Sequence, residues 1–190
     1  MFHNDDGSES EVDMMYQGFE NVEYHESEAY QTITLPYKSH KYSMVLVLPK
    51  EGIDINDIMS NLDWLDDATD LQDVDLYMPR FKFDNTLSFK EILTRLGLGD
   101  MFEKEDCLPN ITDLPAHISE IKQQCVITVE EEGTEAAAVT MAECEGCPPP
   151  DDIPEPITMR IDRPFGFAIR GYYNQLLFMG VVKNMNNKHC

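Results

Sequence analysis

The most informative part of the sequence is Glu130-Glu131-Glu132-Gly133-Thr134-Glu135-Ala136-Ala137-Ala138-Val139-Thr140-Met141-Ala142-Glu143-Cys144-Glu145-Gly146. If this stretch becomes a strand, successive side chains point to opposite faces of the sheet. One face then carries only small side chains, namely Thr134, Ala136, Ala138, Thr140, Ala142, Cys144 and Gly146. The other face carries larger and mostly charged side chains, so the strand could slide under a covering layer while its other side faces water. Glu and Ala are also good helix formers, so the composition fits a helix or a flexible loop equally well.

Apolar periodicity before this stretch predicts several strands. Residues 33–37 alternate apolar and polar side chains, which is typical of a half-buried strand. Residues 42–48 form a denser apolar run, which predicts a strand buried on both faces. Residues 74–78 alternate again, and the β-branched residues 126–129 predict the core of a further strand.

Two helices are predicted in the same part of the chain. Residues 54–62 carry apolar side chains at helical spacing. A second helix is expected to begin at Thr86 and to end at Gly97. Its apolar face is expected to consist of Phe89, Ile92, Leu93 and Leu96.

The last part of the chain returns to a strand pattern. Residues 165–169 alternate, residues 176–182 are apolar, and the short link 171–175 suits a hairpin. Strands therefore dominate over two or three helices, which indicates the α+β class.

Charge and composition exclude several functions. Fourteen basic residues against thirty-six acidic ones give a formal net charge of -22. Such a polyanion repels nucleic-acid phosphates and anionic membranes, so neither is expected as a partner. No apolar run reaches the roughly 18–20 residues needed to cross a bilayer. The five cysteines are odd in number and loosely spaced, which does not make a disulfide framework.

Catalytic and metal-binding patterns are missing from the sequence. The five His residues stand singly, and no HExxH, GxGxxG or GxSxG motif occurs. Cys144 and Cys147 form a CxxC that His189 and Cys190 could in principle complete. A tetrahedral zinc site needs ligand pairs on rigid turns, however, and these pairs lie in a loop and at a terminus. We therefore expect no catalytic residue, no metal and no cofactor.

Two motifs resemble the serpin family. The stretch from Glu131 to Ala138 resembles the hinge of the serpin reactive-centre loop, and the stretch from Ile161 to Arg170 resembles the signature that follows this loop. Further matches run through the whole sequence in serpin order, namely residues 12–15, 35–37, 43–49, 79–81, 87–102 and 178–182. The resemblance covers the second half of a serpin domain, so residues 1–190 are expected to be the C-terminal part of a single such domain. Met1 is expected to be an internal methionine, the start of a truncated gene model or a fragment boundary.

The resemblance implies a serpin fold of mostly antiparallel and mixed sheets, a few helices and an exposed reactive-centre loop at about residues 132–156. It also implies a protease inhibitor that is a suicide substrate, not an enzyme, whose cleaved loop inserts into the main sheet. The hinge would consist of Gly133, Thr134, Glu135, Ala136, Ala137 and Ala138. Arg80 is expected to pair with Glu131 at the top of that sheet. The alternative is a non-inhibitory serpin-fold binding or carrier protein.

The partner implied is a serine protease, or alternatively a cysteine protease, and the localisation implied is extracellular, with the cytoplasm as the alternative. No basic residue occurs between Glu130 and Thr158, which disfavours trypsin-like targets. Gly166 replaces a residue that is usually large and apolar in the signature, and looser packing is expected there.

The position of the reactive bond follows from two constraints. Counting forward from Gly133 at the usual serpin spacing reaches Cys147, which Pro148 follows. A bond before proline is a poor protease substrate, because the ring fixes the backbone and removes an N–H. The cut is therefore expected just upstream, at Gly146–Cys147 or Glu145–Gly146. The loop is several residues longer than in typical members, so Asp152–Ile153 remains the alternative.

Overall fold

The fold was obtained as a computed structural model that describes residues 1–105, 108, 110–112, 114–131 and 154–185. The elements, in chain order, are β1 (Phe2–His3), β2 (Glu9–Ser10), β3 (Met14–Glu26), β4 (Tyr30–Pro36), β5 (Tyr42–Pro49), α1 (Ile55–Met59), η1 (Asp63–Leu65), β6 (Asp70–Pro79), β7 (Phe81–Ser88), α2 (Lys90–Leu93), η2 (Thr94–Leu98), α3 (Asp100–Glu103), β8 (Lys122–Val129), β9 (Ile157–Arg160), β10 (Phe165–Gly171) and β11 (Leu176–Val182). None of the helices in these ranges is long and apolar enough to cross a membrane.

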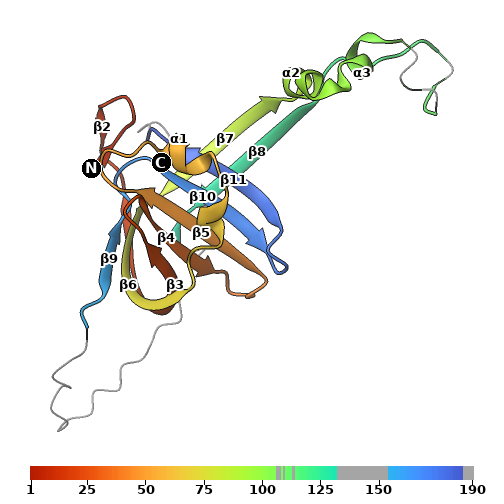
Figure 1. Cartoon of the computed structure of the whole chain (residues 1–190). Helices are drawn as coiled ribbons and strands as arrows, with labels where there is room; N and C mark the ends of the chain where they lie inside the picture. Colours follow the sequence, from red (N-terminus) through yellow and green to blue (C-terminus); the bar gives the residue numbers. More distant parts are fainter. Residues whose placement is uncertain (106–107, 109, 113, 132–153, 186–190) are drawn as a thin grey trace, which may run out of the picture. The chain divides into compact units, whose positions relative to one another are not determined.

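Seven of the strands form one mixed sheet in the order β11-β10-β5-β4-β3-β6-β9 (Figure 1). All neighbours in it are antiparallel except β6 and β9, which run parallel. A parallel pair requires a long connection between its strands, and here the chain from 80 to 156 provides it. The strand-rich α+β class predicted from the sequence is confirmed.

The centre of this sheet is buried on both faces. In β5, residues 44–49 are all buried, as their continuous apolar run predicts. The strand β4 was expected to be half-buried, but this prediction is wrong, because Thr32 and Thr34 are buried as well as Ile33 and Leu35. The reason is topological. β4 lies between β3 and β5 in the middle of the sheet, and a threonine methyl group packs acceptably in such a position.

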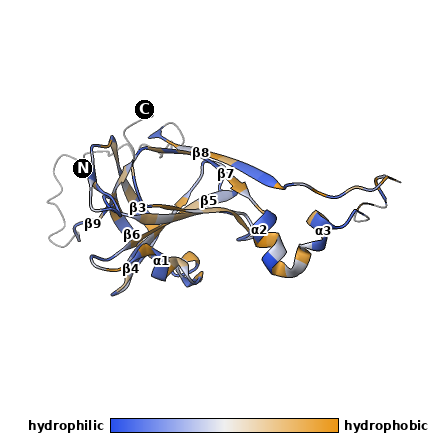
Figure 2. Cartoon of the chain, turned by 90° about the horizontal axis from the view of Figure 1, so that it is seen from above, coloured by the Kyte–Doolittle hydropathy of each residue, from blue (hydrophilic) through white to orange (hydrophobic). Residues whose placement is uncertain are grey.

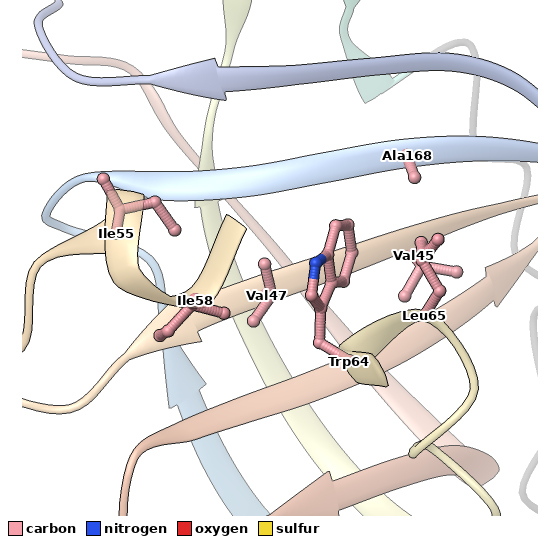
Figure 3. Packing of buried hydrophobic residues seen from close by; sticks show 7 residues of the cluster. All are labelled: Val45, Val47, Ile55, Ile58, Trp64, Leu65 and Ala168. Atoms are coloured by element: carbon pink, nitrogen blue, oxygen red, sulfur yellow. The ribbon is translucent and has the colours of Figure 1, made fainter. Parts of the chain in front are cut away.

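A small helical cover closes one face of the sheet (Figure 3). The helix α1 begins after Asp54, whose carboxylate accepts a hydrogen bond from the Asn56 backbone N–H and caps the helix. Its buried side chains and those of η1 pack on β5 and β10 in one cluster, made of Val45, Val47, Ile55, Ile58, Trp64, Leu65 and Ala168. The helix predicted over residues 54–62 is therefore confirmed for Ile55–Met59, but it ends before Leu62, which is exposed.

The chain divides into two compact units, of which the second comprises residues 82–128. In this unit β7 pairs with β8, and the short helical segments α2, η2 and α3 lie between them in sequence. Figure 2 shows apolar residues on these helical segments, and Ile92 and Leu96 are exposed in the described part of the chain.

The helix predicted from Thr86 to Gly97 is wrong at its beginning. The strand β7 continues to Ser88, and the Phe89 backbone N–H then donates to the Ile121 carbonyl. Pairing with a distant segment therefore extends the strand over residues 86–88, which the sequence pattern predicted to be helical. At the other end, Gly97 adopts a non-helical conformation with a φ of 89°, which kinks the chain inside η2, so the helix that begins with α2 ends at Gly97 as predicted.

Candidate functional site

One side of the site is the point at which the chain leaves the described part after β8. There the Arg80 Nη2 atom donates to Glu131 Oε1 at 2.6 Å. Arg80 directly follows β6, and its backbone N–H donates to the Asp13 carbonyl, so the sheet itself fixes the position of Arg80. The two side chains that were expected to pair therefore lie in hydrogen-bonding contact.

The electrostatics of this pair follow from the contact. The hydrogen bond from Arg80 lowers the pKa of Glu131, and the same bond raises the pKa of Arg80. The carboxylates of Asp13 and Glu130 raise the pKa of Arg80 further. Both side chains are about half exposed, so solvent screens the attraction, and the pair acts mainly by fixing where the stretch after Glu131 begins.

The other side of the site is the point at which the chain returns, at β9. This strand runs parallel to β6, with Ile157 beside Val74 and Arg160 beside Tyr77. The Ile161 backbone N–H then donates to the Tyr77 carbonyl at 2.8 Å. Both ends of the stretch 132–156 are thus tied to β6, one after its last residue and one near its middle.

A polar corner fixes the chain immediately after β9. The His3 backbone N–H donates to the Asp162 carbonyl at 2.7 Å. The Arg163 guanidinium donates through Nε and Nη2 to the Pro49 carbonyl, at 3.0 and 2.9 Å. Sequence reasoning did not identify these contacts, because the partners lie more than a hundred residues away and no local pattern marks them.

The strand that follows, β10, carries the second motif found in the sequence. Phe165, Phe167 and Ala168 are buried, and the ring of Phe81 packs against both phenylalanine rings at centroid distances of 5.6 Å. These edge and tilted arrangements are the favourable ones for aromatic rings. The start of β7 and the motif strand therefore share one aromatic core.

The loose packing expected at Gly166 does not occur. A Cβ atom built there would lie 2.7 Å from Met59 Sδ and 2.8 Å from Val47 Cγ1. The space that a larger side chain would take is therefore filled by the flexible thioether at the end of α1 and by β5. Methionine suits this purpose because its unbranched side chain adapts to irregular gaps.

The motif ends at a buried cation that sequence reasoning also missed. Arg170 is 8% exposed, and its Nη1 donates to the Leu65 carbonyl at 2.6 Å and to Asp66 Oδ1 at 2.9 Å. A buried guanidinium is tolerated only with such partners. The contact fixes the end of η1 against β10.

The remaining residues predicted for the site lie outside the described residues. These are the hinge from Gly133 to Ala138, the bond candidates Glu145, Gly146 and Cys147, and the alternative Asp152–Ile153. Cys144, His189 and Cys190, which the sequence does not predict to bind a metal, lie outside them too. Of the stretch 132–156, the structure describes residues 154–156, which are exposed and have no regular secondary structure.

The fold and the site define a class of protein, namely an α+β domain that anchors both ends of one long connection on a single mixed sheet. A family model described as "Serpin (serine protease inhibitor)" matches residues 1–185. The chain therefore belongs to the serpin family.

Individual relatives agree with this assignment. A serine protease inhibitor of Cyanea capillata is 33% identical over 197 residues, covering 96% of this chain and 50% of that protein. Antithrombin-III of Homo sapiens is 33% identical over 197 residues, covering 97% of this chain and 41% of that protein. The crystal structure of the thermophilic serpin Tengpin in its native state matches with a TM-score of 0.73 at 30% identity, covering 97% of this chain and 49% of that one. The chain thus spans about half the length of the relatives it matches.

Proposed function

We propose that this protein inhibits an extracellular endopeptidase as a suicide substrate, with residues 132–156 as its reactive-centre loop in a single serpin domain. The observation that carries the proposal is the anchoring of this stretch at both ends, by Arg80–Glu131 before it and by β9 after it. The row of small side chains from Thr134 to Gly146 supports it, because an inserting strand must place one face under a packed layer.

The chemistry needs no catalytic group from this chain. The protease supplies a serine or cysteine nucleophile, which attacks the carbonyl carbon of the cleaved peptide bond. That C–N bond breaks, the new amino terminus leaves with a proton, and an acyl-enzyme ester or thioester remains. Insertion of the loop then holds the protease at this stage. Serpin loop insertion is an established family mechanism, and the proposal extends it to this chain.

The proposed reactive bond is Gly146–Cys147 or Glu145–Gly146. A cut after Gly146 would suit a protease that prefers small residues, such as an elastase, and a cut after Glu145 would suit a glutamate-specific protease. Trypsin-like proteases are not proposed as targets, because residues 131–157 contain no basic side chain.

The test mixes the protein, expressed from its full coding sequence, with an elastase, a glutamate-specific protease, chymotrypsin, trypsin and a papain-like protease. We expect a covalent complex that resists SDS with one of the first two. Mass spectrometry of the released C-terminal peptide should show a start at Cys147 or Gly146. A start at Ile153 would place the reactive bond at the alternative site. If no protease in the panel forms a complex, the result would favour a non-inhibitory binding or carrier protein.

Two loop variants make the test specific for insertion. Thr134→Arg places a charge on the row of small side chains and should turn the inhibitor into a cleaved substrate, because a buried unpaired charge opposes insertion. Glu135→Arg places the same charge on the opposite face and should leave complex formation intact. Equal complex formation by both variants would refute the argument from the row of small side chains.

A further inference from the structure

One three-residue pattern in the second unit matches the acceptor sequence for N-linked glycosylation. The chain reads Asn110-Ile111-Thr112, which fits Asn-x-Ser/Thr with a residue other than proline in the middle. The chain contains ten Asn residues, and Asn110 is the one that stands in such a pattern. A pattern this short also arises by chance, so its place in the structure decides whether the folded chain could carry a glycan there.

Asn110 lies near the tip of a closed loop in the connection between α3 and β8 (Figure 1). The Ala116 backbone N–H donates to the Glu105 carbonyl at 2.6 Å, and the Ile118 backbone N–H donates to the Met101 carbonyl at 3.0 Å. These two bonds close the base of the loop, and Asn110 is near the middle of the chain between Glu105 and Ala116. A group attached near the tip of such a surface loop stays in solvent when the chain folds.

The backbone around Asn110 forms a turn that leaves its side chain in water. The Leu108 carbonyl accepts hydrogen bonds from the Ile111 and Thr112 backbone N–H groups, at 3.0 and 3.1 Å. Asparagine is a common residue in turns. Asn110 is exposed, so its side-chain amide nitrogen can carry a bulky hydrophilic group without displacing any part of the core.

Thr112 supplies the hydroxyl group that the acceptor pattern requires. Its Oγ1 atom accepts a hydrogen bond from the Leu114 backbone N–H at 3.1 Å, which fixes the side chain in the loop. A hydroxyl group has two acceptor lone pairs and one proton, so this bond leaves the O–H group able to donate. The third residue of the pattern is therefore held in place with its proton available to a transferring enzyme.

Two large apolar side chains of the same loop stand in water. Ile111 is 79% exposed and Leu114 is 74% exposed. Apolar surface in water is unfavourable and favours contact with other molecules. A glycan on the neighbouring Asn110 would be bulky and hydrophilic, so it would shield this part of the loop.

We propose that Asn110 is an N-glycosylation site. This inference rests on the extracellular part of the proposed function, because glycans of this class are attached to secreted proteins. The donor is a lipid-linked oligosaccharide diphosphate. The Asn110 Nδ2 atom forms a bond to C1 of the first sugar, and the bond between C1 and the diphosphate oxygen breaks. The leaving lipid diphosphate takes up the proton that Nδ2 loses.

The test expresses the protein from its full coding sequence in insect cells and treats the secreted protein with peptide-N-glycosidase F. We expect the treatment to increase its mobility on an SDS gel. Trypsin releases residues 105–122 as one peptide, in which Asn110 is the single Asn. After treatment in heavy-oxygen water, mass spectrometry should find aspartate with one heavy oxygen at position 110, because the glycosidase hydrolyses the modified amide.

Two substitutions at Thr112 separate the acceptor pattern from folding. Thr112→Val keeps the shape of the side chain but removes its hydroxyl, so the mobility shift should disappear although Asn110 remains. Thr112→Ser keeps the hydroxyl and should retain the glycan, whereas Asn110→Gln should lose it. Because the glycan is attached inside the cell, cell-associated protein gives the same readout for a variant that is not secreted.

The matched control is Asn85→Gln. Asn85 is also exposed, in β7, but Leu87 stands where the pattern needs Ser or Thr. The mobility shift should therefore remain unchanged in this variant.

The outcomes separate this proposal from the inhibitory function. A secreted wild type that the glycosidase leaves unchanged would refute the glycosylation site, and so would a shift that persists in Thr112→Val or Asn110→Gln. A wild type retained in the cytosol would refute it together with the extracellular localisation. The inhibitory function is measured independently, by the covalent complex with a protease.

Discussion

Arg80 and Glu131 show how two single residues fix the beginning of a long connection. They are 51 positions apart in the sequence. Arg80 directly follows β6, whereas Glu131 lies two residues after the end of β8. The contact is solvent-exposed, so its importance lies in where it places Glu131 and less in the energy of the pair.

This contact gives a prediction for pH. Arg80→Met removes the donor that lowers the pKa of Glu131, so this pKa should rise toward the ordinary value of 4.5. A carbon-detected NMR titration of the carboxylates would measure the change. Asp6 is the control, because Ser8 lowers its pKa and Arg80 takes no part. An unchanged Glu131 pKa in the variant would show that the pair does not form in solution.

The sign of the effect on stability follows from the lowered pKa. A carboxylate whose pKa is lower in the folded state stabilises that state at every pH above its unfolded pKa. This contribution is lost as the pH falls through the lowered folded value. The difference in stability between wild type and Arg80→Met should therefore be present at neutral pH and disappear under strongly acidic conditions.

At the scale of elements, the contact between α1 and β10 depends on a glycine facing a methionine. Gly166 leaves the space that Met59 Sδ fills, and Val47 of β5 closes it from the other side. The short helix α1 is held by such contacts because, at five residues, it has little stability of its own.

Gly166→Ala should therefore destabilise the fold by about 1–3 kcal/mol, the usual cost of overpacking a core. Urea unfolding monitored by Trp64 fluorescence would measure it, since Trp64 is buried in the same cluster. Met59→Ala makes room, so the double variant should lose less stability than the sum of the two single variants. Strict additivity would contradict the proposed contact between the two positions.

At the scale of the whole molecule, the two compact units are stabilised by different structures. The unit built on the seven-stranded sheet has its own buried core, whereas the unit from 82 to 128 is built on the pair β7 and β8. An isolated two-stranded ribbon is marginally stable in water. The proposed mechanism requires a sheet whose strands part to admit the loop, and this pair alone does not provide one.

A polypeptide limited to residues 1–190 should accordingly fail to trap a protease. We expect it to be cleaved in the loop without an SDS-resistant complex, whereas the protein from the full coding sequence should form one with the same enzyme. Gel analysis at equal molar ratios would compare them. Stoichiometric inhibition by residues 1–190 alone would overturn the insertion argument.

Much of this protein could be predicted from local sequence patterns. The strands β5, β6 and β10 and the helix α1 follow from apolar spacing, because burial of one or both faces imposes a fixed period on side chains. The family followed from the stretch at Glu131–Ala138 and the motif at Ile161–Arg170, since backbone and packing requirements at those positions restrict the residues. The pairing of Arg80 with Glu131 was predicted only through the family resemblance.

Tertiary structure alone decided the rest, because the contacts involved join residues far apart in the chain. The position of β4 between two other strands buried Thr34, which the alternation over residues 33–37 had assigned to the surface. Pairing with residue 121 extended β7 into a predicted helix. Met59 filled the space beside Gly166, and parallel pairing brought Arg160 of β9 over Tyr77. A local sequence pattern reports which face of an element is apolar, and only the assembled sheet determines what that face meets.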